Sequence, residues 1–380
     1  MVTLGDSFRQ YGPQYLQRHA DRLAASQRQA LRAIAVCRTE ALGGHVYRCA
    51  ACGEMLYSYH SCRNRHCPQC QHAAAQRWLQ EQQDLLLPVP YFLLTFTLPA
   101  ELRSVAQQQP RLIYNLLFRA SAAAAQELAH DPRFIGGQLG LIGILQTWAR
   151  NLTDHPHIHY LVPSGGWDPT TQTWRPARPD FLLPVKALSV LFRAKFRDGL
   201  RQSALFRDIP PTVWQQDWVV HCLPVGTGAP ALKYLAPYVF RSPHLHLRAS
   251  RSAGVGVSNK RIVSLANDQV SFVYTAARTR QRQTCTLDAL AFIDRFLQHV
   301  LPKGFCKVRY YGCFSPSQRP TLQAVRHWFA QMSVPDAAAE LLVAAASPPA
   351  AMRCPKCQQP MAVVATLRPT ARCPPPAAGI

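Results

Sequence analysis

The sequence predicts an α+β protein that is preceded by a small zinc-binding module. Segments with apolar residues at helical spacing alternate with short apolar runs rich in β-branched and aromatic residues, without internal repeats. Near the N-terminus, residues 37–70 contain paired cysteines at spacings typical of zinc ligands. With 380 residues, of which 48% are hydrophobic, the chain is long enough for one large domain and smaller ones.

The expected helices follow from apolar residues that recur every three or four positions. They cover residues 8–36, 71–87, 110–129, 184–206 and 286–301, the last with Thr286 as its N-cap. The expected strands are apolar runs bounded by proline, glycine or polar turns. They cover residues 91–98, 140–148, 157–163, 217–223, 260–265, 269–276 and 308–315. The strands within 140–163 are expected to form one hairpin, and those around Asn267 another.

The charge of the chain is strongly positive. Lys and Arg number 42 against 20 Asp and Glu, which gives a formal net charge of +22. Most of the positive residues are arginines, whose planar guanidinium suits phosphates and base edges. A GC-rich genome would explain arginine over lysine, but not the excess of positive over negative charge. This balance favours a polyanionic partner, above all a nucleic acid.

The sequence gives no sign of a membrane or export segment. Residues 1–19 contain no apolar signal core, and the longest uncharged run, residues 85–100, is too short to span a bilayer. We therefore expect a cytoplasmic protein without a membrane partner. In that compartment clustered cysteines are more often metal ligands than disulfides.

The cysteine module contains two CxxC turns. Each such turn offers two thiolates, and two turns complete a tetrahedral zinc site. The expected ligands of one structural zinc ion are therefore Cys49, Cys52, Cys67 and Cys70. The remaining candidates, Cys37, His45, Cys62 and His66, could build a second site, or Cys62 and His66 could exchange with the first.

Three arginines of the module, Arg48, Arg63 and Arg65, lie among tyrosines. Cations mixed with aromatic rings suit a nucleic-acid surface, although tyrosines in a small zinc module can equally form its core. A weaker cysteine group lies near the C-terminus, with Cys354 and Cys357 followed by Cys373. It is either half of a second zinc ribbon or part of a disordered tail rich in proline and alanine.

The hexapeptide HPHIHY, residues 155–160, places His157 and His159 on either side of one isoleucine. On a strand, residues two apart point to the same face, so both rings would lie side by side. Two neutral imidazoles on a rigid strand are suitable ligands for a divalent cation. The alternative is that both are ordinary strand histidines that face solvent.

A tyrosine pair lies in residues 231–241, ALKYLAPYVFR. Tyr234 and Tyr238 are four apart and would share one face of a helix, which Pro237 would kink. A phenol can attack a phosphodiester when a metal ion polarises the phosphate, and Lys233 and Arg241 could hold flanking phosphates. The alternative is that both tyrosines only pack.

Together these motifs resemble the insertion sequence 91 family of bacterial transposases, which are rolling-circle transposases of the HUH class with two tyrosines. The resemblance rests on SCRNRHCPQC, FTLP, HPHIHYLVPSGG, YLAPYVFR and LPKGFCKVRYYG, in this order, and covers roughly residues 20–365. It implies a zinc-binding domain within 1–75 and an HUH endonuclease domain with an antiparallel sheet within 76–315. We expect a C-terminal helical region in 316–380, with a zinc knuckle in its tail as one alternative.

The resemblance also implies roles for single residues. His157 and His159 would bind Mg²⁺ or Mn²⁺. The third ligand stays open between His155 and a polar side chain near the tyrosine helix, with Gln146 as a weaker candidate. Tyr234 and Tyr238 would be nucleophiles that form a 5′-phosphotyrosine with single-stranded DNA at transposon ends and targets. A protein with this activity would work at the bacterial nucleoid.

One segment departs from the family pattern. Residues 242–256, between YVFR and VSNKR, look like an insertion. If this insertion displaces the tyrosine helix, the protein would be an inactive transposase remnant. Two rival functions remain at this stage. A zinc-dependent DNA-binding protein without catalysis would give the histidine and tyrosine pairs no role. A metal-free tyrosine recombinase would leave the paired histidines unexplained.

Overall fold

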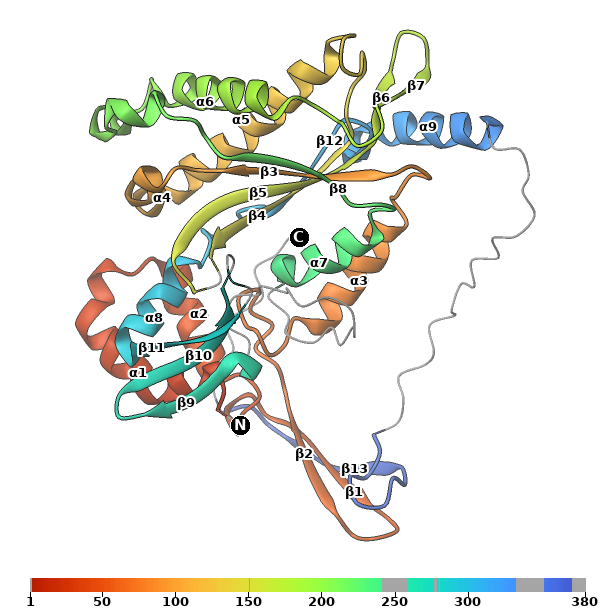
Figure 1. Cartoon of the computed structure of the whole chain (residues 1–380). Helices are drawn as coiled ribbons and strands as arrows, with labels where there is room; N and C mark the ends of the chain where they lie inside the picture. The colour runs from red at the N-terminus through yellow and green to blue at the C-terminus, as the bar shows by residue number, and fades with distance from the viewer. Residues whose placement is uncertain are drawn as a thin grey trace.

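The structure, a computed structural model, describes residues 2–149, 151–240, 259–276, 279, 281–332 and 352–370. The predicted α+β class is confirmed, because helices cover both faces of an antiparallel five-stranded sheet (Figure 1). Three parts follow from the cores and sheets: the central sheet with its helices, a helical part with a second sheet, and a small sheet at the bottom of the view in Figure 1.

The central sheet contains the predicted histidine strand in its middle. Its strands, in spatial order, are Val308–Tyr311 (β12), Leu141–Trp148 (β4), Asp154–Pro163 (β5), Tyr91–Thr97 (β3) and Val220–Pro224 (β8). All neighbours are antiparallel, and β4 and β5 form the predicted hairpin. Because β5 has a partner on each side and helices over both faces, nine of its ten residues are buried.

Helices cover the two faces of this sheet through separate apolar cores. On one face lie Arg103–Gln108 (α4), Pro110–His130 (α5) and Val185–Leu200 (α6). On the other lie His72–Gln83 (α3) and Ala229–Phe240 (α7), and Arg319–Met332 (α9) shares their core. Residues of β4 and β5 alternate between the cores: Ile158 joins the first, whereas Ile144 and Leu161 join the second. The sequence prediction missed the helix α4 and a hairpin of Gly165–Asp168 (β6) and Thr173–Pro176 (β7), whereas α9 lies in the region 316–380 that was expected to be helical.

The helical part joins the N-terminus to a segment far along the chain. Its helices are Leu4–His19 (α1), Ala25–Ala35 (α2) and Ala289–Gln298 (α8), and its sheet consists of Ile262–Ala266 (β9), Gln269–Thr275 (β10) and Arg282–Asp288 (β11). The turn between β9 and β10 confirms the predicted second hairpin. All six elements share one core, which also contains Cys37, Cys62 and Cys67. The boundaries at 75 and 315 stay predictions.

Two local predictions in this part were wrong. The expected helix 8–36 is two helices, because the chain leaves the helical path through a 3-10 turn at Ala20–Arg22 and an extended Leu23. Thr286 is not the cap of α8, because it lies in β11 opposite Ser271, and their hydroxyls are 2.8 Å apart. Asp288 caps the helix instead, by accepting from the backbone N–H of Leu290 and Ala291.

The third part is a small sheet whose middle strand is Gly44–Cys49 (β1). Its neighbours are Met55–Tyr59 (β2) and Met361–Leu367 (β13), and both pair antiparallel to it. The C-terminal strand therefore lies against the N-terminal module, which excludes a disordered tail for residues 352–370. Cys373, Arg241 and the segment 242–256 lie outside the described residues. In the part of the chain that the structure describes, every helix is too short or too polar to span a bilayer.

Candidate functional site

His157 and His159 lie on the buried middle strand of the central sheet, and each is 9% exposed. Their rings are adjacent, with centroids 4.9 Å apart. His155 continues the row, with its ring 5.1 Å from that of His157. The strand prediction for this hexapeptide is therefore confirmed, since the histidines at alternate positions do share one face.

Hydrogen bonds fix which nitrogen each ring offers. Nδ1 of His157 donates to the backbone oxygen of His155 at 2.6 Å, since a carbonyl can only accept. Nδ1 of His159 lies 2.8 Å from the hydroxyl of Thr95, its cross-strand neighbour on β3. Both rings thus engage Nδ1 within the fold. Nε2 of His157 is therefore the nitrogen for a ligand, and Nε2 of His159 takes the same role when its Nδ1 donates to the hydroxyl of Thr95, as in metal-binding histidines.

Burial keeps both imidazoles neutral. Desolvation lowers the pKa of His157 well below its ordinary value, and the neighbouring His159 lowers it further. Desolvation likewise lowers the pKa of His159 to about 4. A neutral ring has a lone pair on the nitrogen that carries no proton, so both residues are suited to bind a cation at neutral pH.

Gln146 of β4 contacts this pair directly. Its Oε1 lies 3.0 Å from Nε2 of His157, and two acceptors then face each other. Its Nε2 is buried and has no hydrogen-bond partner among the described residues. A cation between the amide oxygen and the imidazole would account for the two facing acceptors, and so would the opposite assignment of the amide O and N, which turns this contact into a donor–acceptor hydrogen bond. The donor set of two imidazoles and one amide oxygen fits a divalent ion.

Tyr234 on α7 lies beside the histidines. Its ring centroid is 6.4 Å from that of His159, with 81° between the ring planes. Tyr238 lies one turn further along the same helix, but its side chain is outside the described residues. Lys233 is exposed on α7. The fold thus brings one of the two predicted tyrosines next to the predicted metal ligands.

The cysteines form two tetrads, and in each the four sulfur atoms lie within 4.8 Å of one another. The first consists of Cys37, Cys62, Cys67 and Cys70, and the second of Cys49, Cys52, Cys354 and Cys357. The predicted grouping of Cys49 and Cys52 with Cys67 and Cys70 is therefore wrong. Four thiolates at such distances fit structural zinc. In the first tetrad a hydrogen bond from Cys62 holds the pKa of Cys37 well below its ordinary value.

His66 and Arg65 are held inside the fold, whereas the other two arginines of the module are exposed. His66 is buried outside both tetrads, and its Nε2 accepts a hydrogen bond from Arg65 at 3.2 Å. Arg65 also donates to the backbone oxygens of Phe305 and Pro302, at 2.8 and 3.1 Å. Arg48 and Arg63 are exposed. The guanidinium of Arg65 is therefore engaged inside the fold, whereas the other two face solvent.

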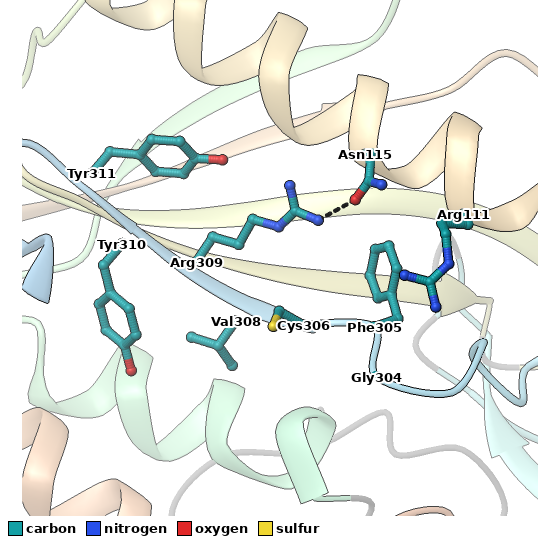
Figure 2. Close-up of a pocket in the computed structure, with 9 residues that line it drawn as sticks. All are labelled: Arg111, Asn115, Gly304, Phe305, Cys306, Val308, Arg309, Tyr310 and Tyr311. Atoms are coloured by element: carbon teal, nitrogen blue, oxygen red, sulfur yellow. Dashed lines mark hydrogen bonds between the residues drawn. The ribbon is translucent and has the colours of Figure 1, made fainter. Parts of the chain in front are cut away.

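A basic pocket of about 510 Å³ lies where β12 meets α5 (Figure 2). The guanidinium of Arg309 donates to Asn115 and lies 4.3 Å from the ring centroid of Phe118. Arg111 lines the same pocket and donates to the backbone oxygen of Lys303. Arg309 lies in the stretch LPKGFCKVRYYG and was not predicted as a site residue; the signal that could have identified it is a cation inside an aromatic strand.

Two sequence families match the chain. The family described as "Putative transposase" matches residues 140–321, which include the histidines and Tyr234. The family described as "Transposase zinc-binding domain" matches residues 7–98, which include the first tetrad but only half of the second. No solved structure matches the chain.

Two named proteins are similar over most of their length. "Putative transposase y4qJ" of Sinorhizobium fredii is 37% identical over 352 residues, which are 87% of this chain and 85% of that protein. "Transposase for insertion sequence element IS801" of Pseudomonas savastanoi pv. phaseolicola is 28% identical over 299 residues, 73% of this chain and 67% of that protein.

Proposed function

The chain belongs to the insertion sequence 91 family of transposases, and we propose that it nicks and rejoins single-stranded DNA at insertion-sequence ends through a 5′-phosphotyrosine. The observation that supports this mechanism best is the position of Tyr234, whose ring lies 6.4 Å from that of His159. A nucleophile beside a pair of neutral imidazoles is the arrangement that metal-assisted phosphoryl transfer needs.

In this mechanism Nε2 of His157 and of His159 would hold Mg²⁺ or Mn²⁺, with the amide oxygen of Gln146 as a third ligand. The bound ion would polarise the scissile phosphate and stabilise the charge on the leaving oxygen. Thr95 and the carbonyl of His155 keep the two rings in place through Nδ1.

The nucleophile in the first step is the hydroxyl of Tyr234. Its oxygen attacks the phosphorus, the bond from phosphorus to the 3′ oxygen breaks, and the phenol's proton ends on the released 3′ hydroxyl. The 5′ phosphate stays joined to the tyrosine, so the energy of the phosphodiester is kept for rejoining. In the reverse direction a 3′ hydroxyl attacks the phosphotyrosine and frees the phenol. Tyr238 would cut a second strand while the first stays attached.

Exposed cations would bind the DNA backbone. Arg48 and Arg63 of the zinc-binding module and Lys233 beside the nucleophile are exposed, and the net charge of +22 favours a polyanion. Arg241 would extend this set, whereas Arg65 is occupied within the fold. Such an enzyme would act in the bacterial cytoplasm, at the nucleoid.

A denaturing gel tests the mechanism. A single-stranded oligonucleotide from the insertion-sequence end is labelled at its 3′ end, because the fragment with the 5′ phosphate stays on the protein. With Mn²⁺ the wild type should give a labelled band at the mass of the protein plus DNA, and Tyr234→Phe/Tyr238→Phe should give none. Tyr274→Phe, on β10 and hydrogen bonded to Gln283, is the matched control and should keep the band. A persisting band in the double variant would place the nucleophile elsewhere.

A further inference from the structure

The second cysteine tetrad is built from two distant parts of the chain. Sγ of Cys49 lies 3.4 Å from Sγ of Cys357, and Sγ of Cys52 lies 3.5 Å from those of Cys354 and Cys357. These distances are far longer than a disulfide bond of about 2.05 Å. They are close to the roughly 3.8 Å edge of a tetrahedron with Zn–S bonds of about 2.3 Å.

The two CxxC turns of this tetrad, Cys49–Cys52 and Cys354–Cys357, have the same backbone hydrogen bond. In each turn the residue after the second cysteine donates to the oxygen of the first: Gly53 to Cys49 at 3.0 Å, and Gln358 to Cys354 at 2.9 Å. Gly53 and Gln358 also both have a positive φ, of 73° and 59°. Since Gln358 is not a glycine, this left-handed conformation needs support from the surrounding turn. Two matching turns that face each other are expected for ligand pairs of one ion, but not for an accidental cluster.

The strands beside the tetrad connect the same two parts of the chain. β13 pairs with β1 from Gly44 opposite Leu367 to Cys49 opposite Met361 (Figure 1). An ion pair between Lys356 and Glu54 joins the two turns at 2.5 Å. Both residues are partly exposed, so this pair adds little to the stability of the small sheet.

The small sheet has almost no apolar core of its own. The buried residues of its cluster are Cys49, Cys354 and Met361, and two of these three are members of the tetrad. On β13, Val363 and Val364 are each 52% exposed. A module this small usually needs a metal ion or disulfides to stay folded. The stability of the small sheet therefore depends on a bond or ion that joins its four sulfur atoms.

We propose that Cys49, Cys52, Cys354 and Cys357 bind one zinc ion as thiolates, and that this ion fastens β13 to the N-terminal module. The ion replaces the protons of the four thiols, which pass to solvent. The zinc-binding family match ends at residue 98 and so contains only the first pair of these ligands. The site is distinct from the first tetrad, whose members all lie within residues 37–70. It does not depend on the proposed nicking reaction.

The zinc content of the full chain tests the number of sites. The wild type should contain two zinc ions per chain, one for each tetrad. Cys354→Ser/Cys357→Ser should contain one. Cys306→Ser removes an exposed cysteine outside both tetrads and should still contain two. A wild type with one ion, or a double variant with two, would overturn the proposal.

A second measurement tests the fastening role without changing a ligand. A protease site is inserted within residues 333–351 of the full chain, and the purified protein is cleaved there. The C-terminal fragment should elute with the rest of the protein while both zinc ions are bound, and should separate once a chelator removes them. A fragment that separates with two zinc ions still bound, or that stays attached after both have been removed, would refute the role given to the ion.

Discussion

The ring of Tyr234 lies edge-on to the ring of His159, 6.4 Å away between centroids. α7 and β5 are far apart in the sequence, and the core between α7 and the sheet brings the two residues together. In the proposed mechanism, a phenol in this position would reach a phosphate bound to the metal ion at Nε2 of the histidines. Four predictions follow from the surroundings of this pair and of the zinc-binding module.

Replacing both histidines by alanine, in His157→Ala/His159→Ala, should reduce nicking about a thousandfold or more. A metal ion at a reacting phosphate contributes several kcal/mol to the transition state. Binding of single-stranded DNA should stay within about threefold, because the exposed cations that are proposed to contact phosphates are unchanged. The measurement is Mn²⁺-dependent cleavage of a labelled oligonucleotide beside a binding titration. His327→Ala, an exposed histidine on α9, should behave like the wild type. Wild-type cleavage in the double variant would exclude these ligands.

Gln146→Ala should weaken Mn²⁺ binding about 10- to 100-fold, which is typical for the loss of one coordinating or supporting group. Gln146→His should bind Mn²⁺ at least as tightly as the wild type, because an imidazole takes the place of the amide oxygen. Free Mn²⁺ measured by electron paramagnetic resonance gives both affinities without relying on activity. Equal affinities in the alanine variant and the wild type would show that Gln146 only bonds to His157.

The two tyrosines should contribute unequally to covalent adducts. Attack requires the phenol to be in line with the leaving oxygen. Tyr238 lies one helical turn beyond Tyr234 on α7, after Pro237, so the two hydroxyls are not expected to have the same alignment. Tyr234→Phe should therefore reduce adduct formation more strongly than Tyr238→Phe on an oligonucleotide with one cleavage site. The two bands are compared on the same denaturing gel. If both single variants lose equal amounts, the two hydroxyls are equivalent in the first step.

Substitutions of Arg65 and Arg63 should have different effects: the first should lower the stability of the fold, and the second should weaken DNA binding. Arg65→Ala removes two hydrogen bonds from a charged group to backbone oxygens, and should lower the free energy of unfolding by about 2–4 kcal/mol. Arg63→Ala should change it by less than about 0.5 kcal/mol, but should reduce the salt dependence of DNA binding by about one unit of slope. Urea unfolding and binding at several salt concentrations distinguish the two. A stable Arg65→Ala variant that has lost DNA affinity would reverse these roles.

Local periodicity predicted most strands of the central sheet, because the alternation of side chains along a strand depends on neighbouring residues. The alternation in HPHIHY predicted a strand because side chains two residues apart on a strand point to the same face. The short apolar run of β3, bounded by prolines, is typical of a buried strand. Boundaries were less predictable. Thr286 has the right side chain for a helix cap, but its pairing with Ser271 extends β11 past it, and cross-strand pairing cannot be read from local sequence.

The partners of the cysteines could not be predicted from spacing. A CxxC turn specifies one pair of ligands, but the second pair can come from any part of the chain. Cys67 and Cys70 are nearer to Cys49 in sequence, whereas Cys354 and Cys357 are nearer in space. The same limit applies to Tyr234, since its distance from the histidines depends on how α7 packs on the sheet.

The pairing of β1 with β13 has a consequence for synthesis on the ribosome. Cys52 and Cys354 are 302 residues apart, so β1 emerges long before its second partner. At about 5–20 residues per second, the edge of β1 stays unpaired for roughly 15–60 s in each nascent chain. An open strand edge can pair with other chains during this interval. A nascent or prematurely terminated polypeptide is therefore exposed to aggregation at its N-terminal hairpin, and this exposure ends when β13 pairs with β1.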